Sequence, residues 1–182
     1  GVPFSDPKAD GPLIQHSSQI AIQQKTSVED CFKIVKEIRK INHDIPIILM
    51  GYYNPIHYYG NLKFIKNAIS SGVDGLIIVD LPMEEDKEFH DLSFKNNLPL
   101  IRLVTPTTDE IRLKKILKNA RGFVYYVSVT GITGTKSASV KDVKNKIKII
   151  KKNTNLPVIV GFGIKNSIDA EKMSAISDGI VI

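Results

Sequence analysis

The sequence predicts an α/β protein of the (β/α)8 class, the TIM barrel, in an incomplete form. Along its 182 residues, short runs of apolar and β-branched residues alternate with segments of helical spacing. Continuous apolar runs are typical of strands buried on both faces of a parallel sheet, and the intervening helices supply the crossovers. Polar stretches with glycine or proline follow nearly every run. A barrel builds its functional site from loops at many strand ends, so this pattern favours a barrel.

Six apolar runs predict buried strands. They cover residues 45–50, 75–79, 98–104, 123–129, 156–160 and 179–182. A complete barrel has eight strands and typically about 250 residues. We therefore expect residues 1–182 to form a single (β/α) barrel domain that is truncated at both ends and lacks the first strands and the final helix.

The segments between these runs predict helices. Residues 26–29 (TSVE) have the pattern of a capping box, and residues 139–142 (SVKD) resemble a second one. Further helices are expected at 62–70, 84–95, 109–119 and 167–174. An open, doubly wound sheet would show the same alternation. Its dinucleotide-binding form requires G-x-G-x-x-G directly after the first strand, and no such stretch is present.

Composition limits the function classes. The net charge is +6, but the lysines are spread over several predicted helix faces without an arginine cluster, so nucleic-acid binding is not expected. No apolar run approaches the roughly 20 residues of a membrane span, and we expect a cytoplasmic protein that does not bind membranes. Cys31 sits among apolar residues and predicts a buried side chain. The four histidines are scattered without ligand spacing, so no metal site is expected.

The first twelve residues, GVPFSDPKADGP, are the most informative stretch. Three prolines and two glycines exclude a helix or a central strand, so this segment is a shaped loop that carries the carboxylates of Asp6 and Asp10. Asp10 precedes Gly11-Pro12, where a ligand could approach the chain closely. From the residues alone, Asp10 is either a functional carboxylate or the capping residue of an Asx-turn or helix. Asp6 is expected to brace the loop.

This loop resembles the signature loop of tryptophan synthase alpha subunits, G-x-P-F-S-D-P-x-A-D-G-P. Residues 50–55, 80–82, 125–134 and 161–163 are similar to further family motifs in the same order, so the resemblance covers essentially the whole chain. It implies a lyase of tryptophan biosynthesis that splits indole-3-glycerol phosphate into indole and glyceraldehyde 3-phosphate by retro-aldol cleavage. It also implies an α2β2 heterotetramer, in which a beta subunit carrying pyridoxal phosphate receives the indole, and no cofactor in this chain.

The same resemblance suggests the catalytic residues. Asp10 matches the carboxylate that we assign to the indole nitrogen, and Tyr125, rather than Tyr126, matches the active-site tyrosine. The partner carboxylate in the family is a glutamate two residues before the position that matches Gly1. We therefore expect residues 1–182 by themselves to be inactive.

The substrate-binding residues follow in the later loops. Gly134 and Gly163 match the family's phosphate loops, where backbone N–H groups can approach phosphate oxygens. Phe162 offers an aromatic face to the indole ring. Residues 131–139 predict a lid, in which Thr133 would brace Asp10 on closure.

Two other functions fit parts of the sequence. The chain could be another phosphate-binding barrel enzyme, an isomerase or a lyase acting on a different phosphorylated substrate. It could also be a non-catalytic partner that activates a beta subunit by docking. Turnover of indole-3-glycerol phosphate separates these readings.

Overall fold

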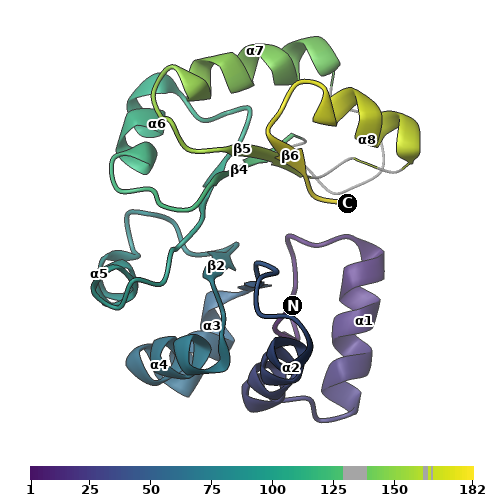
Figure 1. Ribbon diagram of the computed structural model, residues 1–182, viewed down its shortest axis with the longest axis vertical. Coiled ribbons are helices and arrows are strands. Elements are labelled where there is room, and N and C mark those ends of the chain that lie inside the picture. The colour runs from purple at the N-terminus through teal and green to yellow at the C-terminus, as the bar shows by residue number, and fades with distance from the viewer. Residues whose placement is uncertain (129–138, 162–163, 165) are drawn as a thin grey trace. The chain divides into compact units, whose positions relative to one another are not determined.

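The computed structural model describes residues 1–128, 139–161, 164 and 166–182. Within these residues the chain divides into two compact units, Gly1–Leu100 and Ile101–Ile182. Both units consist of parallel strands separated by helices, as the sequence predicts (Figure 1).

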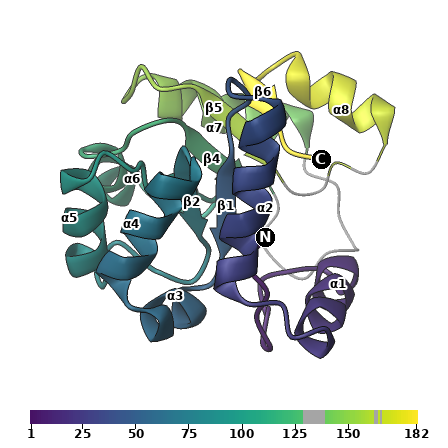
Figure 2. The ribbon, with the colours of Figure 1, turned by 60° about the horizontal axis from the view of Figure 1, so that its bottom comes forward.

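The first unit contains a pair of parallel strands, β1 (Ile48–Gly51) and β2 (Gly75–Ile78), with Ile48 opposite Gly75. Its helices are α1 (Pro12–Gln23), α2 (Val28–Ile41), α3 (Tyr53–Tyr59), α4 (Asn61–Ser71) and α5 (Lys87–Lys95). Helices α2 and α4 contact each other beside the two strands (Figure 2). The core of this unit lies between these helices and the strands, and it includes Phe64 and Leu76.

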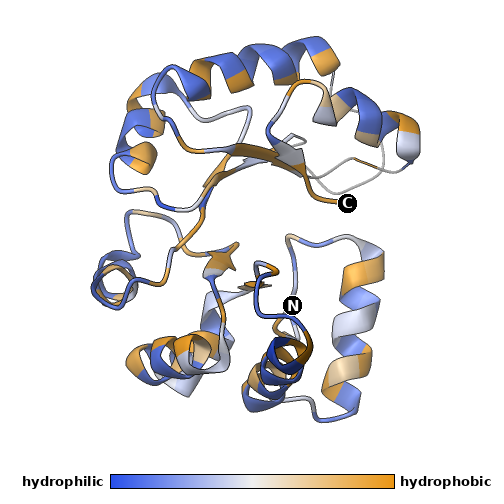
Figure 3. Ribbon diagram, in the orientation of Figure 1, coloured by the Kyte–Doolittle hydropathy of each residue, from blue (hydrophilic) through white to orange (hydrophobic). Residues whose placement is uncertain are grey.

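The second unit contains a four-stranded parallel sheet in the order β3-β4-β5-β6. Its elements are β3 (Arg102–Val104), α6 (Glu110–Leu117), β4 (Val124–Val127), α7 (Val140–Lys151), β5 (Val158–Gly161), α8 (Ser167–Ser174) and β6 (Gly179–Ile180). The central strands are apolar, whereas the helices alternate apolar and polar residues (Figure 3). The apolar residues of α7, including Val143 and Ile150, are buried. In each unit, consecutive strands of the described sheet are neighbours without the reversal of strand order that marks a doubly wound sheet.

Several local predictions need correction. The polar stretch that follows the first predicted strand is not all loop, because Tyr53 begins α3. Pro55 falls in the first turn, where no N–H is needed, and Asp80 accepts the Tyr53 N–H at 2.7 Å. The predicted capping box of α2 lies one residue later than expected, between Ser27 and Asp30. Ser139 does precede α7, but its side chain makes no capping hydrogen bond.

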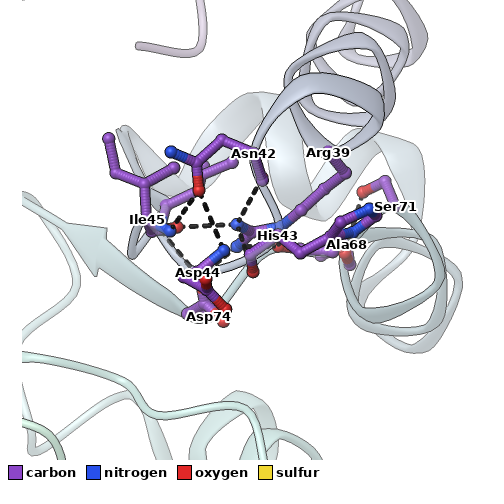
Figure 4. A network of polar contacts seen from close by, with 10 residues as sticks. Arg39, Asn42, His43, Asp44, Ile45, Ala68, Ser71 and Asp74 are labelled. Atoms are coloured by element: carbon purple, nitrogen blue, oxygen red, sulfur yellow. Dashed lines mark hydrogen bonds and ion pairs between the residues drawn. The ribbon is translucent and has the colours of Figure 1, made fainter.

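Arg39 organises the amino-terminal ends of β1 and β2 (Figure 4). Its side chain is 15% exposed and lies against Gly72, whose carbonyl accepts hydrogen bonds from Nε at 2.9 Å and from Nη2 at 2.7 Å. Nη1 donates to the carbonyls of Ile45 at 2.6 Å and His43 at 3.2 Å, and Nη2 also pairs with Asp74. One guanidinium therefore connects the end of α2 with the segments that enter both strands.

Replacing Arg39 by methionine is expected to lower the free energy of unfolding by about 2–4 kcal/mol, because several carbonyls and one carboxylate lose their donor. Lysine should restore little of this loss, since an ammonium cannot reproduce the planar fork. The matched control is Lys40→Met on the same helix. Lys40 forms an exposed pair with Glu37 at 2.7 Å, and its loss should cost at most about 1 kcal/mol. Urea unfolding of both variants measures the difference, and equal losses would contradict the role of Arg39.

Candidate active site

Asp10 lies in the N-terminal loop, one residue before the N-cap of α1. The N-cap residue is Gly11, and α1 has no side-chain capping hydrogen bond, so Asp10 does not cap this helix. Among the described residues, one side-chain oxygen of Asp10 accepts a hydrogen bond: Oδ2, from the Tyr52 hydroxyl at 2.9 Å. Asp6 instead accepts the hydroxyl of the neighbouring Ser5 at 2.6 Å within the exposed part of the loop.

Tyr52 is the residue that fixes the Asp10 carboxylate. It follows the last residue of β1 and is 6% exposed. Its hydroxyl donates to Asp10 and accepts the N–H of Ala9 at 2.9 Å, and its ring lies 5.2 Å from the ring of Phe4. Burial and the hydrogen bond to Asp10 raise the pKa of Tyr52 to about 12, so the hydroxyl keeps its proton at neutral pH.

This role of Tyr52 is not evident from the residues around it in the sequence. One available signal was position, because Tyr52 comes directly after a strand, at the strand end where a barrel places functional groups. The partner itself lies 42 residues away in the sequence, and no local pattern indicates such a contact.

The raised pKa of Tyr52 predicts a change in alkaline stability. The folded-state pKa of about 12 exceeds the ordinary value of 10.0, so the protonated phenol stabilises the fold fully below pH 10, and this stabilisation is lost as the pH rises through about 12. Between these values, the free energy of unfolding should fall more steeply in the natural protein than in Tyr52→Phe. In an alkaline titration followed by tyrosinate absorbance, the variant should show one fewer tyrosine that ionises at high pH than the natural protein. Identical titration curves would contradict the assignment.

Tyr125 lies on β4 in the second unit and is 3% exposed. Neighbouring residues on a strand face opposite sides, so Tyr126 points the other way. Burial, together with the charge of Asp142 on α7, raises the pKa of Tyr126. The Tyr125 side chain lies beside Gly161 of the neighbouring strand β5.

Gly161 provides the space for the Tyr125 side chain. A Cβ at Gly161 would lie 1.9 Å from the Tyr125 hydroxyl oxygen and 2.3 Å from Cζ. The carbonyl of Gly161 also accepts hydrogen bonds from the Ser128 N–H at 3.0 Å and from the Ser128 hydroxyl at 3.1 Å. The carboxyl ends of β4 and β5 are thereby joined next to Tyr125.

The other predicted site residues are Thr133, Gly134, Phe162 and Gly163, and they lie outside the residues that the structure describes. Asp10 belongs to the first unit and Tyr125 to the second. Cys31 is buried, and burial raises the pKa of its thiol. Within the described ranges, no three His, Cys, Asp or Glu side chains form a group that could hold a metal ion. None of the helices described is long and apolar enough to cross a membrane.

Comparison with known proteins gives a consistent result over the whole chain. The family model for the tryptophan synthase alpha chain matches residues 1–182. The tryptophan synthase alpha chain of Geotalea uraniireducens (strain Rf4) is 46% identical over 182 residues, which make up 100% of this chain and 68% of that protein.

Solved structures agree with the sequence comparison. Tryptophan synthase subunit alpha from Campylobacter jejuni is 39% identical, with a TM-score of 0.88 and coverage of 100% of this chain and 72% of that chain. A chain in the structure of the tryptophan synthase a2b2 complex from Pyrococcus furiosus is 38% identical, with a TM-score of 0.87 and coverage of 100% and 73%.

These relatives confirm the predicted fold class. The solved alpha subunits are (β/α)8 barrels, and the residues described here contribute six parallel strands in two sheets to that fold, fewer than the eight of a complete barrel. The family match covers every strand, helix and loop discussed above, including the Asp10 loop. The chain belongs to the tryptophan synthase alpha chain family, whose members are lyases of tryptophan biosynthesis.

Proposed function

We propose that Asp10 is the carboxylate that stabilises the indole nitrogen while indole-3-glycerol phosphate is cleaved. The single observation that carries this role is the hydrogen bond from Tyr52 to Oδ2. This bond holds the side chain in one orientation, and Oδ1 is the oxygen that we propose to accept the N–H of the substrate. Asp10 is half-buried, so it combines access with a partly desolvated environment that strengthens such a hydrogen bond.

The reaction needs three events at the reacting atoms. The bond between indole C3 and the adjacent glycerol carbon breaks, C3 gains a proton, and the hydroxyl on the glycerol carbon loses its proton as it becomes the aldehyde carbonyl. Positive charge develops on the indole ring when C3 is protonated, and an ionised carboxylate at the ring N–H stabilises this charge. Asp10 is proposed for that task.

We assign the remaining roles from the family pattern. Tyr125 is proposed as a second residue in contact with the reacting part of the substrate, supported by its burial on β4 beside Gly161, at the carboxyl end of β5. Gly134 and Gly163 are proposed to bind the phosphate through backbone N–H groups, Phe162 to contact the indole ring, and Thr133 to contact Asp10. The whole chain is proposed to form one barrel domain.

The partner and the location are also proposals. The relative from Pyrococcus furiosus is part of an a2b2 complex, which supports a beta subunit as the partner of this chain and as the recipient of indole. Pyridoxal phosphate is proposed for the beta subunit only. We place the protein in the cytoplasm because it belongs to a family of biosynthetic enzymes that act on a small phosphorylated substrate.

The test is a steady-state assay of indole release from indole-3-glycerol phosphate. The protein is assayed with all residues that its gene encodes, alone and with the beta subunit. Release of indole and glyceraldehyde 3-phosphate in equal amounts supports the proposal. Stimulation of the beta subunit without any release would favour the non-catalytic partner, and turnover of a different phosphorylated substrate would favour another barrel enzyme.

A further inference from the structure

Helix α1 holds the Asp10 loop through two of its own side chains. The Ser18 hydroxyl accepts the N–H of Phe4 and donates to the carbonyl of Phe4, both at 3.0 Å. Gln15, nearly one turn earlier, donates from Nε2 to the main-chain carbonyl of Asp10 at 3.0 Å and to that of Pro7 at 3.5 Å. We call Gln15 and Ser18 the α1 clamp. It joins the beginning and the end of the loop to one helix.

Among the described residues, α1 meets the loop through the hydrogen bonds of the α1 clamp. None of the 12 residues of α1 is buried, and Leu13 and Ile14 at its start are 79% and 53% exposed. A helix of this length is marginal without tertiary contacts. The hydrogen bonds of the α1 clamp supply such contacts between α1 and the loop.

Two chains of contact lead from the α1 clamp to the Asp10 carboxylate. Gln15 bonds the main chain of Asp10 itself. Ser18 fixes Phe4, whose ring packs 5.2 Å from the ring of Tyr52, and the Tyr52 hydroxyl donates to Asp10 Oδ2. Both the main chain and the side chain of Asp10 thus depend on residues of α1.

We propose that Ser18 and Gln15 are positioning residues for the lyase reaction: they hold the loop so that Tyr52 can orient the Asp10 carboxylate towards the substrate. This inference rests on the function proposed for Asp10. Neither residue is assigned a contact with the substrate. The physical reason for an effect on rate is that a shift of about 1 Å in a reacting group can cost about 100-fold in rate.

The experiment compares neighbouring residues of the same helix in the full protein with its beta subunit. Ser18→Ala removes both hydrogen bonds to Phe4. Its control is Ser17→Ala, because the exposed Ser17 hydroxyl donates only within α1, to Ile14 at 2.9 Å. Gln15→Ala has the exposed Gln19→Ala as its control. The measurements are kcat and KM for indole release and the melting temperature.

We expect Ser18→Ala and Gln15→Ala each to lower kcat by about tenfold, with KM within about twofold of the natural value, while both controls stay within about twofold in kcat. Ser18→Thr keeps a hydroxyl and should recover most of the lost kcat. Gln15 is exposed, so Gln15→Ala remains informative if Ser18→Ala does not fold.

Three results would overturn the proposal. The clamp variants could have the same kcat as their controls, or their kcat could fall only in proportion to a lowered melting temperature. In the third case, Ser18→Thr would fail to restore the kcat lost in Ser18→Ala. Asp10→Asn separates this failure from failure of the proposed function. If Asp10→Asn keeps the natural rate of indole release, the role proposed for Asp10 is wrong. If it is inactive while the clamp variants match their controls, only the positioning role is wrong.

Discussion

Asp10→Asn is expected to lower kcat for indole release by about 10²- to 10⁴-fold, because the variant replaces a carboxylate by a neutral amide of nearly the same shape. The side-chain amide oxygen of the variant can still accept the Tyr52 hydroxyl, which donates to Asp10 Oδ2 in the natural protein at 2.9 Å. The loop should therefore keep its conformation while the negative charge at the indole nitrogen is lost. The assay is steady-state indole release, accompanied by the melting temperature of each variant.

The matched control is Asp6→Asn in the same loop. Asp6 is exposed, and its carboxylate accepts the hydroxyl of Ser5 at 2.6 Å. Asp6→Asn removes the same charge from the same segment, so a general electrostatic effect on a phosphorylated substrate would appear in both variants. Assayed without the beta subunit, Asp6→Asn should stay within about threefold of the natural kcat. Equal losses in the two variants, or an active Asp10→Asn, would refute the specific role of Asp10.

Gly161→Ala is expected to damage both stability and activity. Its Cβ would meet the Tyr125 hydroxyl oxygen at 1.9 Å and Cζ at 2.3 Å, so the buried phenol must move. Overpacking of this kind costs about 1–3 kcal/mol, and displacement of a group at the reacting atoms by about 1 Å can cost about 100-fold in rate. Urea unfolding and indole release measure the two effects.

Gly179→Ala on the adjacent strand β6 is the control. Among the described residues, its Cβ would meet the terminal Cδ1 of Ile159 alone, at 2.9 Å, and this flexible end can rotate away. The loss of stability should therefore be smaller than in Gly161→Ala, and kcat should change little. Tyr125→Phe removes the hydroxyl without crowding the sheet and shows how much of the rate loss belongs to that group. A Gly161→Ala protein with natural kcat would contradict the placement of Tyr125 at the site.

The strands and most helices were predictable because they depend on interactions between residues close in the sequence. A strand buried on both faces needs a continuous apolar run, and all four residues of β2 are buried. A helix needs an apolar stripe and caps, and α8 has the bounds that its sequence predicts, with the Asn166 side chain accepting the N–H of Asp169 at 2.9 Å. These features depend on residues a few positions apart, so the sequence displays them directly.

The sequence was less informative about where the pairing between two strands begins and ends. The apolar run at 98–104 was expected to be one strand, but Leu100 bridges Leu76 in the first unit, whereas Arg102–Val104 forms β3 in the second. A segment must be apolar to be buried, whether it pairs with a strand of the first unit or of the second. A run of hydrophobic residues therefore cannot show which partner strand each of its parts will meet.

Part of the candidate site was likewise predictable from the sequence, and part was not. The carboxylate and glycines of the first loop, together with the order of the later motifs, were enough to indicate the family and to select Asp10 and Tyr125 for the proposed site. The tertiary structure alone decided that Tyr52 orients Asp10, that Gly161 makes room for Tyr125, and that α1 fixes the loop through Gln15 and Ser18. The physical reason is distance along the chain. Propensity and periodicity act between near neighbours, whereas the Tyr52–Asp10 hydrogen bond joins residues 42 positions apart and exists only once β1 brings Tyr52 to the loop.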